Sequence, residues 1–161
     1  MKKLIYLAIL FFSVGSSYAQ NKLSKEVIQK DSVIKVDIID PAVQEAQGEA
    51  PDWAALTAEI TQKYDATFAD RTVTKGIIYY SWGKDWPTFT AAIVKYTNKY
   101  EDPDDLVVLN YNANFILKYS SNPSEIATAL SWSKHTVDKA PANEEYKKTY
   151  AALSAKKSGQ N

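Results

Sequence analysis

The side chains that most often perform catalysis are scarce in this chain. It contains one histidine, His135, and no cysteine. A zinc site needs several His, Cys or acidic ligands at defined spacings, and His135 has no second histidine or cysteine to join it. Thiol chemistry is excluded, and any histidine-dependent triad would have to use His135. We therefore expect a protein that is not an enzyme, with no catalytic residue, no metal site and no cofactor.

The densest acidic cluster runs from Glu101 to Asp105. Carboxylate oxygens are the ligands that calcium prefers, so a calcium loop is one interpretation. The cluster lacks the alternating acids, the central glycine and the terminal glutamate of an EF-hand loop. Acidic residues also favour the first turn of a helix, where they complement the helix dipole. We favour that second interpretation, in which the cluster marks the start of a helix.

Aromatic residues are abundant, with four Trp, eleven Tyr and five Phe. Aromatic rings can bind a peptide or stack on a sugar, although at helical spacing they more often pack in a core. Trp132 falls outside the apolar stripe of its predicted helix, and Tyr111 lies beside another stripe. Tyr79 and Trp82 belong to a short aromatic run. We predict these four residues as candidates for partner binding.

Helical periodicity dominates the sequence from residue 51 onward. Trp86, Phe89 and Ile93, for example, recur at the spacing that places side chains on one helix face. Asp or Asn near a proline, a typical helix-start signal, precedes most of the periodic segments. These signals are Asp52 after Pro51, Asp85 before Pro87, Asp102 before Pro103, Asn122 before Pro123 and Asn143 after Pro141. The pattern predicts about six helices joined by short loops.

The segment 71–82 is ambiguous. It is rich in β-branched and aromatic residues, which favour a strand, and it contains Gly76. Phe68, Val73, Ile77 and Tyr80 nevertheless keep roughly helical spacing, and the neighbouring segments are helical. We predict a helix here, with a strand as the alternative.

The N-terminus has the features of a secretory signal. Two lysines precede an apolar stretch that ends at Val14, and Ser17 and Ala19 place small residues where a signal peptidase cleaves. We expect residues 1–19 to be this signal, and the remaining protein to be periplasmic or secreted. Because the apolar stretch is too short to span a bilayer, no membrane span should remain after cleavage. Residues 20–50 predict a linker or flexible arm, in which 32–39 could form one short strand.

The charge balance limits the classes of partner. Basic and acidic residues are equal at 19 each, so the formal net charge is 0. A neutral chain has no strong electrostatic attraction to nucleic acid or to acidic membranes. We expect a protein or peptide partner and no nucleic-acid partner.

A weak internal repeat accompanies the helices. An offset of about 39 residues, within the range of helix-pair repeats, aligns Tyr111 with Tyr150 and Ala113 with Ala152. Helix pairs of this kind stack on one another to bury their apolar faces. The expected fold is therefore all-α, with antiparallel helix pairs in the domain 51–161.

Several motifs in that domain resemble a known family. They are Lys84-Asp85-Trp86 with Phe89, Tyr96 and Tyr100; Leu109-Asn110 with Ala113; Ala129 with Trp132 and Lys134; and Tyr150 to Leu153 with Lys157 and Gly159. In this order they are similar to the tetratricopeptide-like helical C-terminal region of exported thioredoxin-like proteins of Bacteroidetes. The thioredoxin domain and its Cys-x-x-Cys are absent, so the resemblance implies a fold and no catalytic residue. The family's tail usually has a further helix, so the last helix here is expected either to cap the repeat or to bind a partner.

The resulting functional hypothesis is a non-catalytic exported helical-repeat protein that acts as a protein-interaction or scaffolding module. One alternative is a small saccharide- or peptide-binding protein, or a hydrolase that uses two carboxylates. Another is a truncated relative of the thioredoxin-like proteins with no independent activity. The sequence leaves all three open.

Overall fold

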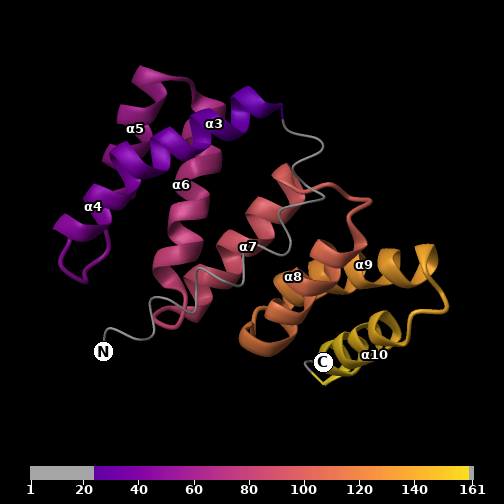
Figure 1. Ribbon diagram of the computed structural model, residues 1–161. Coiled ribbons are helices and arrows are strands. Elements are labelled where there is room, and N and C mark those ends of the chain that lie inside the picture. The colour runs from indigo at the N-terminus through magenta and orange to yellow at the C-terminus, as the bar shows by residue number, and fades with distance from the viewer. Residues whose placement is uncertain (1–23, 160–161) are drawn as a thin grey trace.

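The computed structural model describes residues 24–159, and throughout this part of the chain it is all-helical, with no strand (Figure 1). The proposed signal at residues 1–19 lies outside the described residues. The elements are α3 (Lys25–Ile34), the π-helical η1 (Lys35–Ile39), α4 (Asp40–Glu45), α5 (Trp53–Lys63), α6 (Ala66–Ser81), α7 (Trp86–Tyr100), α8 (Leu106–Tyr119), α9 (Pro123–Lys139) and α10 (Glu144–Ser158).

The segment predicted as a linker is folded where the structure describes it. From residue 25 to residue 45 the chain is helical, so the predicted strand at 32–39 is wrong. Ile34 and Ile38, four residues apart, share one helix face, and both are buried with Ile39 against α5 and α6. A lone strand has no partner for its backbone, whereas a helix satisfies its own hydrogen bonds and can bury these isoleucines. The segment is therefore part of the core and not a flexible arm.

The six helices predicted after residue 51 are confirmed as α5 to α10, and the ambiguous segment 71–82 lies almost entirely in α6. Its Thr and Ser hydroxyls are compatible with a helix because they donate to backbone carbonyls of the preceding turn. The hydroxyl of Thr72 donates to the carbonyl of Phe68 at 2.7 Å. The hydroxyl of Ser81 likewise donates to the carbonyl of Ile77 at 2.6 Å. Tertiary packing on both sides of α6 outweighs its intrinsic preference for a strand.

Gly76 in α6 has a packing role. A Cβ built at this position would lie 3.0 Å from the Trp53 ring and 3.1 Å from a methyl carbon of Ile39. The glycine therefore allows α5 and η1 to approach the α6 backbone closely. A residue that weakens the helix by itself thus serves the contact between helices.

Four of the predicted helix-start residues cap their helices, and the fifth cap lies at a different residue from the predicted one. Asp52, Asp85, Asn122 and Asn143 each accept a hydrogen bond from backbone N–H groups of the following turn. In the acidic cluster the cap of α8 is Asp105, whose carboxylate accepts from Val108 N at 3.0 Å, and not Asp102. The cluster therefore begins a helix, although three residues later than its Asp-Pro signal indicates.

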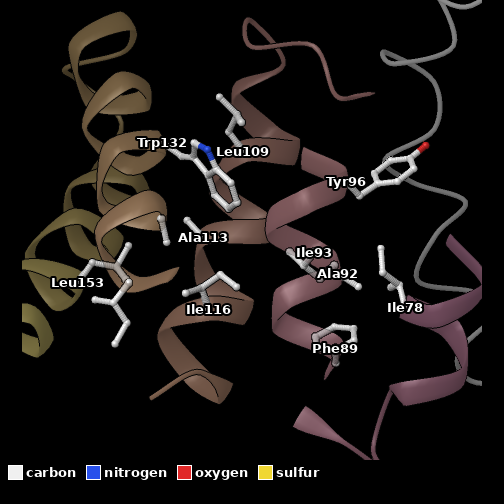
Figure 2. Close-up of a cluster of buried hydrophobic side chains, with 12 residues drawn as sticks. Ile78, Phe89, Ala92, Ile93, Tyr96, Leu109, Ala113, Ile116, Trp132 and Leu153 are labelled. Carbon is white, nitrogen blue, oxygen red and sulfur yellow. The ribbon is translucent and has the colours of Figure 1, made fainter. Parts of the chain in front are cut away.

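The helices pack into two hydrophobic clusters that meet at α6. The first joins α3, η1, α5 and α6 and is mainly aliphatic, with Ile34, Leu56 and Ile60 among its buried residues. The second joins α6 to α10 and includes the aromatic residues Phe89 and Trp132 (Figure 2). From α5 onward consecutive helices run antiparallel (Figure 1), and α6 with α7, α8 with α9, and α9 with α10 form the largest contacts. The contact between α7 and α8 is smaller, and Val107 and Tyr111 on α8 remain exposed.

Within residues 24–159, no helix combines the length and the apolar character that crossing a membrane requires.

Candidate functional site

A set of aromatic side chains is only partly covered where the end of α6, the start of α7 and α8 meet. We call it the aromatic surface, and its members are Trp82, Trp86, Tyr111, Phe115 and Tyr119. Every member has a ring contact with at least one other member. The buried ring of Phe89 lies beneath them, with its centroid 5.0 Å from that of Trp82 and 5.4 Å from that of Phe115.

Trp82 is positioned by the turn that ends α6. Gly83 follows it with a φ of 72°, a left-handed conformation that glycine adopts without strain. The backbone N–H groups of Lys84 and Asp85 then bond to the carbonyl of Ser81, which closes the turn. Trp82 keeps 40% of its surface exposed while its ring makes an edge-to-face contact with Phe115 at 5.0 Å. This turn thus holds a large apolar side chain at the molecular surface.

The α8 part of the aromatic surface follows a four-residue spacing. Val107, Tyr111, Phe115 and Tyr119 therefore lie on one side of the helix. Val107 is 62% exposed and Tyr111 is 39% exposed. The ring of Tyr111 packs edge-to-face on Phe115 with centroids 4.5 Å apart. Tyr119 stacks on Trp86 at 3.7 Å with an interplanar angle of 5°. Because the rings support one another, the exposed side chains have restricted orientations.

Of the four predicted binding residues, the structure places two in the aromatic surface, Trp82 and Tyr111, and they are linked through Phe115. Tyr79 lies one turn before Trp82 on α6 and is 42% exposed. Burial, with a smaller contribution from the negative charge of Asp40, raises the pKa of Tyr79 above its usual value. Its phenol is therefore neutral at physiological pH.

Trp132 does not belong to a binding surface. It is buried, and Figure 2 shows its indole beside Leu109 and Ala113. Its Nε1–H donates to the side-chain oxygen of Asn98 on α7 at 3.0 Å. The residue falls outside the stripe of α9 because it packs between α9 and the helices α7 and α8, so its prediction as a partner-binding residue is corrected.

Positively charged side chains border the aromatic surface. The ammonium of Lys118 lies 4.9 Å from the centre of the Tyr119 ring, and that of Lys84 lies 4.0 Å from the centre of the Tyr80 ring, both within the range of cation–π attraction. Among residues 24–159, neither lysine has a carboxylate within salt-bridge distance. The neighbouring carboxylate of Asp85 instead accepts bonds from the backbone and hydroxyl of Thr88. Because these donors are neutral, Asp85 keeps its negative charge, so unpaired charges of both signs lie near the aromatic surface; the ammonium of Lys84 lies over Tyr80, which is not a member of that surface.

A second polar group lies toward the other end of α6 and α7. Arg71 donates to both carboxylate oxygens of Asp31 on α3, at distances of 2.6–3.1 Å. Asp70 accepts from Lys95, from Lys99 at 2.7 Å and from the hydroxyl of Tyr100 at 2.5 Å. These interactions join α3 to α6 and α6 to α7, so we assign them a structural role.

Two further ionisable groups near this end have shifted pKa values. Burial lowers the pKa of the Lys75 ammonium, which lies 5.2 Å from the centre of the Tyr96 ring. Burial also raises the pKa of the Glu101 carboxyl, while the charge of Lys75 acts in the opposite direction. A carboxylate-based hydrolase would need two carboxylates facing each other across a substrate. The other carboxylates of this region, those of Asp31 and Asp70, are held in ion pairs.

His135 and the acidic cluster do not come together as a metal site. The Nε2 atom of His135 lies 3.7 Å from a carboxylate oxygen of Asp104, which is also 3.5 Å from the ammonium of Lys139. Within the described part of the chain, no three His, Cys, Asp or Glu side chains are grouped in a way that could hold a metal ion.

Three members of the aromatic surface were not predicted from the sequence: Trp86, Phe115 and Tyr119. Trp86 fits the apolar stripe of α7, so its periodicity indicated a core position. The four-residue spacing of Val107, Tyr111, Phe115 and Tyr119 is a second stripe on α8 and was the signal that could have identified this face.

Comparisons with protein-family models, with curated proteins and with solved structures give no match for this chain.

Proposed function

We propose that this chain is a non-catalytic protein-interaction module that binds a partner protein through the aromatic surface. The observation that supports it is the partial exposure of Trp82 and Tyr111 on a common support of packed rings. Trp and Tyr are enriched among the residues that contribute most to protein interfaces, because they bury a large area and lose little conformational freedom. Rings already held by their neighbours lose still less on binding.

A saccharide is a weaker candidate for this surface. A sugar ring stacks on the flat face of an aromatic side chain, whereas Trp86 and Tyr119 each give one face to the other. Trp82 and Tyr111 each pack edge-to-face against Phe115. Rings held at such angles to one another can contact the apolar side chains of a protein. We therefore favour a protein partner.

The proposal includes the repeat type and the location. The antiparallel helix pairs support a tetratricopeptide-like repeat, related to the tail of exported thioredoxin-like proteins, because each pair packs mainly on its neighbours. Export rests on the signal at residues 1–19. N-terminal sequencing of the protein recovered from the periplasm or medium tests it, and a start at Gln20 is the expected result.

The partner hypothesis is tested by comparing variants in affinity capture from an extract of the cells that encode the chain. We expect the double variant Trp82→Ala with Tyr111→Ala to lose a protein that the wild type retains. The matched control is Tyr64→Ala, because Tyr64 is 36% exposed and its ring contacts Phe68, which packs against the other cluster. Equal retention by all three proteins, each with an unchanged circular dichroism spectrum, would contradict the proposal.

A further inference from the structure

One lysine in α6, Lys75, is partly buried although its ammonium has no bonded partner. Neither a salt bridge nor a hydrogen bond joins its Nζ atom to another residue of the described part of the chain. The ammonium lies 5.2 Å from the centre of the Tyr96 ring on α7. The two other lysines that are partly buried within residues 24–159 are bonded, since Lys30 and Lys156 each donate to an oxygen atom, at 2.7 Å and 2.6 Å.

The missing partner changes the chemistry of this side chain. Removing an ammonium from water without giving it a hydrogen-bond acceptor costs free energy, and loss of its proton avoids much of that cost. Burial accordingly lowers the pKa of Lys75, and the positive charge of Arg71, one turn earlier on α6, acts in the same direction. The ring of Tyr96 stabilises the cation only in part. Because burial raises the pKa of its phenol, Tyr96 stays neutral and adds no negative charge.

The carboxylates near Lys75 do not bond to it. Glu101, which follows the last residue of α7, is partly buried, and its carboxyl group has no hydrogen bond or ion pair with another described residue. The charges of Asp31 and Glu101 raise the pKa of Lys75 and so oppose the effect of burial. The carboxylate of Asp31, however, is held by Arg71. Glu101 is therefore the one carboxylate of the two that acts on Lys75 without being bound elsewhere in the described chain.

We propose that Lys75 is a covalent attachment site for small aldehydes, its amine forming an imine with the carbonyl carbon. The nitrogen lone pair attacks that carbon, and one proton of the neutral amine passes to the carbonyl oxygen. The second nitrogen proton then leaves with the hydroxyl group as water, and the C=N bond forms. Only the unprotonated amine can begin this reaction, which is why partly buried lysines serve as imine-forming nucleophiles. The proposal goes beyond the proposed function and does not involve the aromatic surface.

Reductive labelling of the full exported chain tests the proposal. The probe is limiting glycolaldehyde with sodium cyanoborohydride, which reduces the imine to a stable secondary amine, and peptide mass mapping gives the labelling rate of each lysine. The α-amino group, whose pKa is low in any protein, is scored separately. At pH 7 Lys75 should be labelled about 3-fold faster than Lys148, because it holds more free amine, although a less basic amine is a weaker nucleophile. Lys148 is the matched control, since it is exposed on α10 and has no ion pair within residues 24–159.

The pH dependence separates charge state from access. At about pH 10.5 the ordinary lysines are also largely unprotonated, so the excess labelling of Lys75 should disappear. Equal labelling rates of Lys75 and Lys148 at pH 7 would overturn the proposal. An excess that persists unchanged at the higher pH would also overturn it, because it would show that Lys75 is labelled through easier access and not through its free amine.

Two variants complete the test. Lys75→Arg keeps the positive charge and should remove the label from this peptide alone. Glu101→Gln removes a negative charge that favours the protonated form of Lys75, so it should increase the labelling of Lys75 at pH 7 by about 2-fold and leave Lys148 unchanged. An unchanged rate at Lys75 in Glu101→Gln would contradict the effect assigned to this carboxylate.

Discussion

The two hydrophobic clusters of this molecule use different means to hold their helices together. In the N-terminal cluster, helix α3 is joined to α6 by one buried ion pair, Asp31 with Arg71, across 40 residues of sequence. In the C-terminal cluster, Asp70 on α6 pairs with Lys95 and Lys99 on α7, whose side chains are half-exposed, and helices further along are joined by neutral hydrogen bonds such as Asn112 to Thr97 and Trp132 to Asn98. Because α3 is joined to α6 by one charged contact, a single substitution there should strongly lower the stability of the N-terminal cluster. In the C-terminal cluster several contacts share this role, so loss of one neutral hydrogen bond should cost less stability.

The difference also concerns exposure. In the N-terminal cluster, the long helical segment α3 to α4 (Figure 1) buries Ile34, Ile38 and Ile39 against α5 and α6, and the large apolar side chains that it leaves exposed are the aliphatic Val33 and Val36. The C-terminal cluster is rich in aromatic rings, and part of this aromatic set remains at the surface beside α8. A region whose structure does not depend on any one contact can expose apolar side chains for binding without losing its packing, which is why we place the interaction surface there.

The largest predicted effect concerns the buried ion pair. Arg71→Ala should lower the free energy of unfolding by about 3 to 5 kcal/mol, because it leaves the largely buried Asp31 without its partner. Urea denaturation measures the loss, and hydrogen exchange should show α3 losing protection before α8. The double variant Asp31→Leu, Arg71→Met removes both charges and should stay within about 1 kcal/mol of the wild type. A double variant as unstable as Arg71→Ala would show that the pair itself, rather than the orphaned charge, stabilises this region.

The second prediction addresses the neutral contacts. The side-chain amide of Asn112 donates to the hydroxyl of Thr97 at 2.8 Å, and both residues are buried. Asn112→Ala should cost about 1 to 2 kcal/mol, because one buried hydroxyl loses its partner while the neighbouring bonds remain. Thermal or urea unfolding measures it, and Thr97→Val with Asn112→Leu should recover part of the loss. If Asn112→Ala lowered the free energy of unfolding as much as Arg71→Ala does, the two clusters would not differ in their sensitivity to the loss of one contact.

The smallest effect depends on pH and concerns Asp70. Burial alone would raise its pKa, but hydrogen bonds from Lys95, Lys99 and Tyr100 outweigh it and hold the pKa well below its usual range. The carboxylate therefore contributes stability above the unfolded-state pKa of about 3.9, and this contribution is lost as the pH falls below that value. Because both lysines are half-exposed, we expect only about 1 kcal/mol.

Asp70→Asn tests this by urea titration from pH 7 to pH 3. The difference in unfolding free energy between wild type and variant should be constant at neutral pH and should narrow below about pH 4. A difference that persists unchanged at pH 3 would show that Asp70 acts by packing and not by charge.

Local signals in the sequence predicted the helices correctly from residue 51 onward. Asp52, Asp85, Asn122 and Asn143 cap helices because a short polar side chain satisfies free N–H groups wherever a helix begins. Local signals gave the wrong prediction between residues 25 and 45. There Val and Ile suggested a strand, but burial of Ile34 and Ile38 against α5 and α6 stabilises a helix.

The candidate site was predictable only in part, and α8 shows why. This helix carries apolar residues on two faces, one with Leu109, Ala113 and Ile116 and the other with Val107 and Tyr111. Periodicity identifies both faces but cannot tell which one a neighbour covers. The prediction for Trp132 was wrong for the converse reason. This residue lies outside the apolar stripe of α9, yet α7 and α8 cover its side chain.

From residue 51 onward, the amino-acid order alone therefore predicted the helices and most of their starts, because capping and periodicity act within one or two turns of the chain. Which rings are buried and which remain at the surface depends on helices that are distant in sequence and adjacent in space. Two tertiary features accompany the exposed rings of the aromatic surface. One is the smaller contact between α7 and α8, and the other is the turn at Gly83, after which Trp82 packs against Phe115. Whether a side chain is buried depends on which other helices pack against it, so only the tertiary structure shows it.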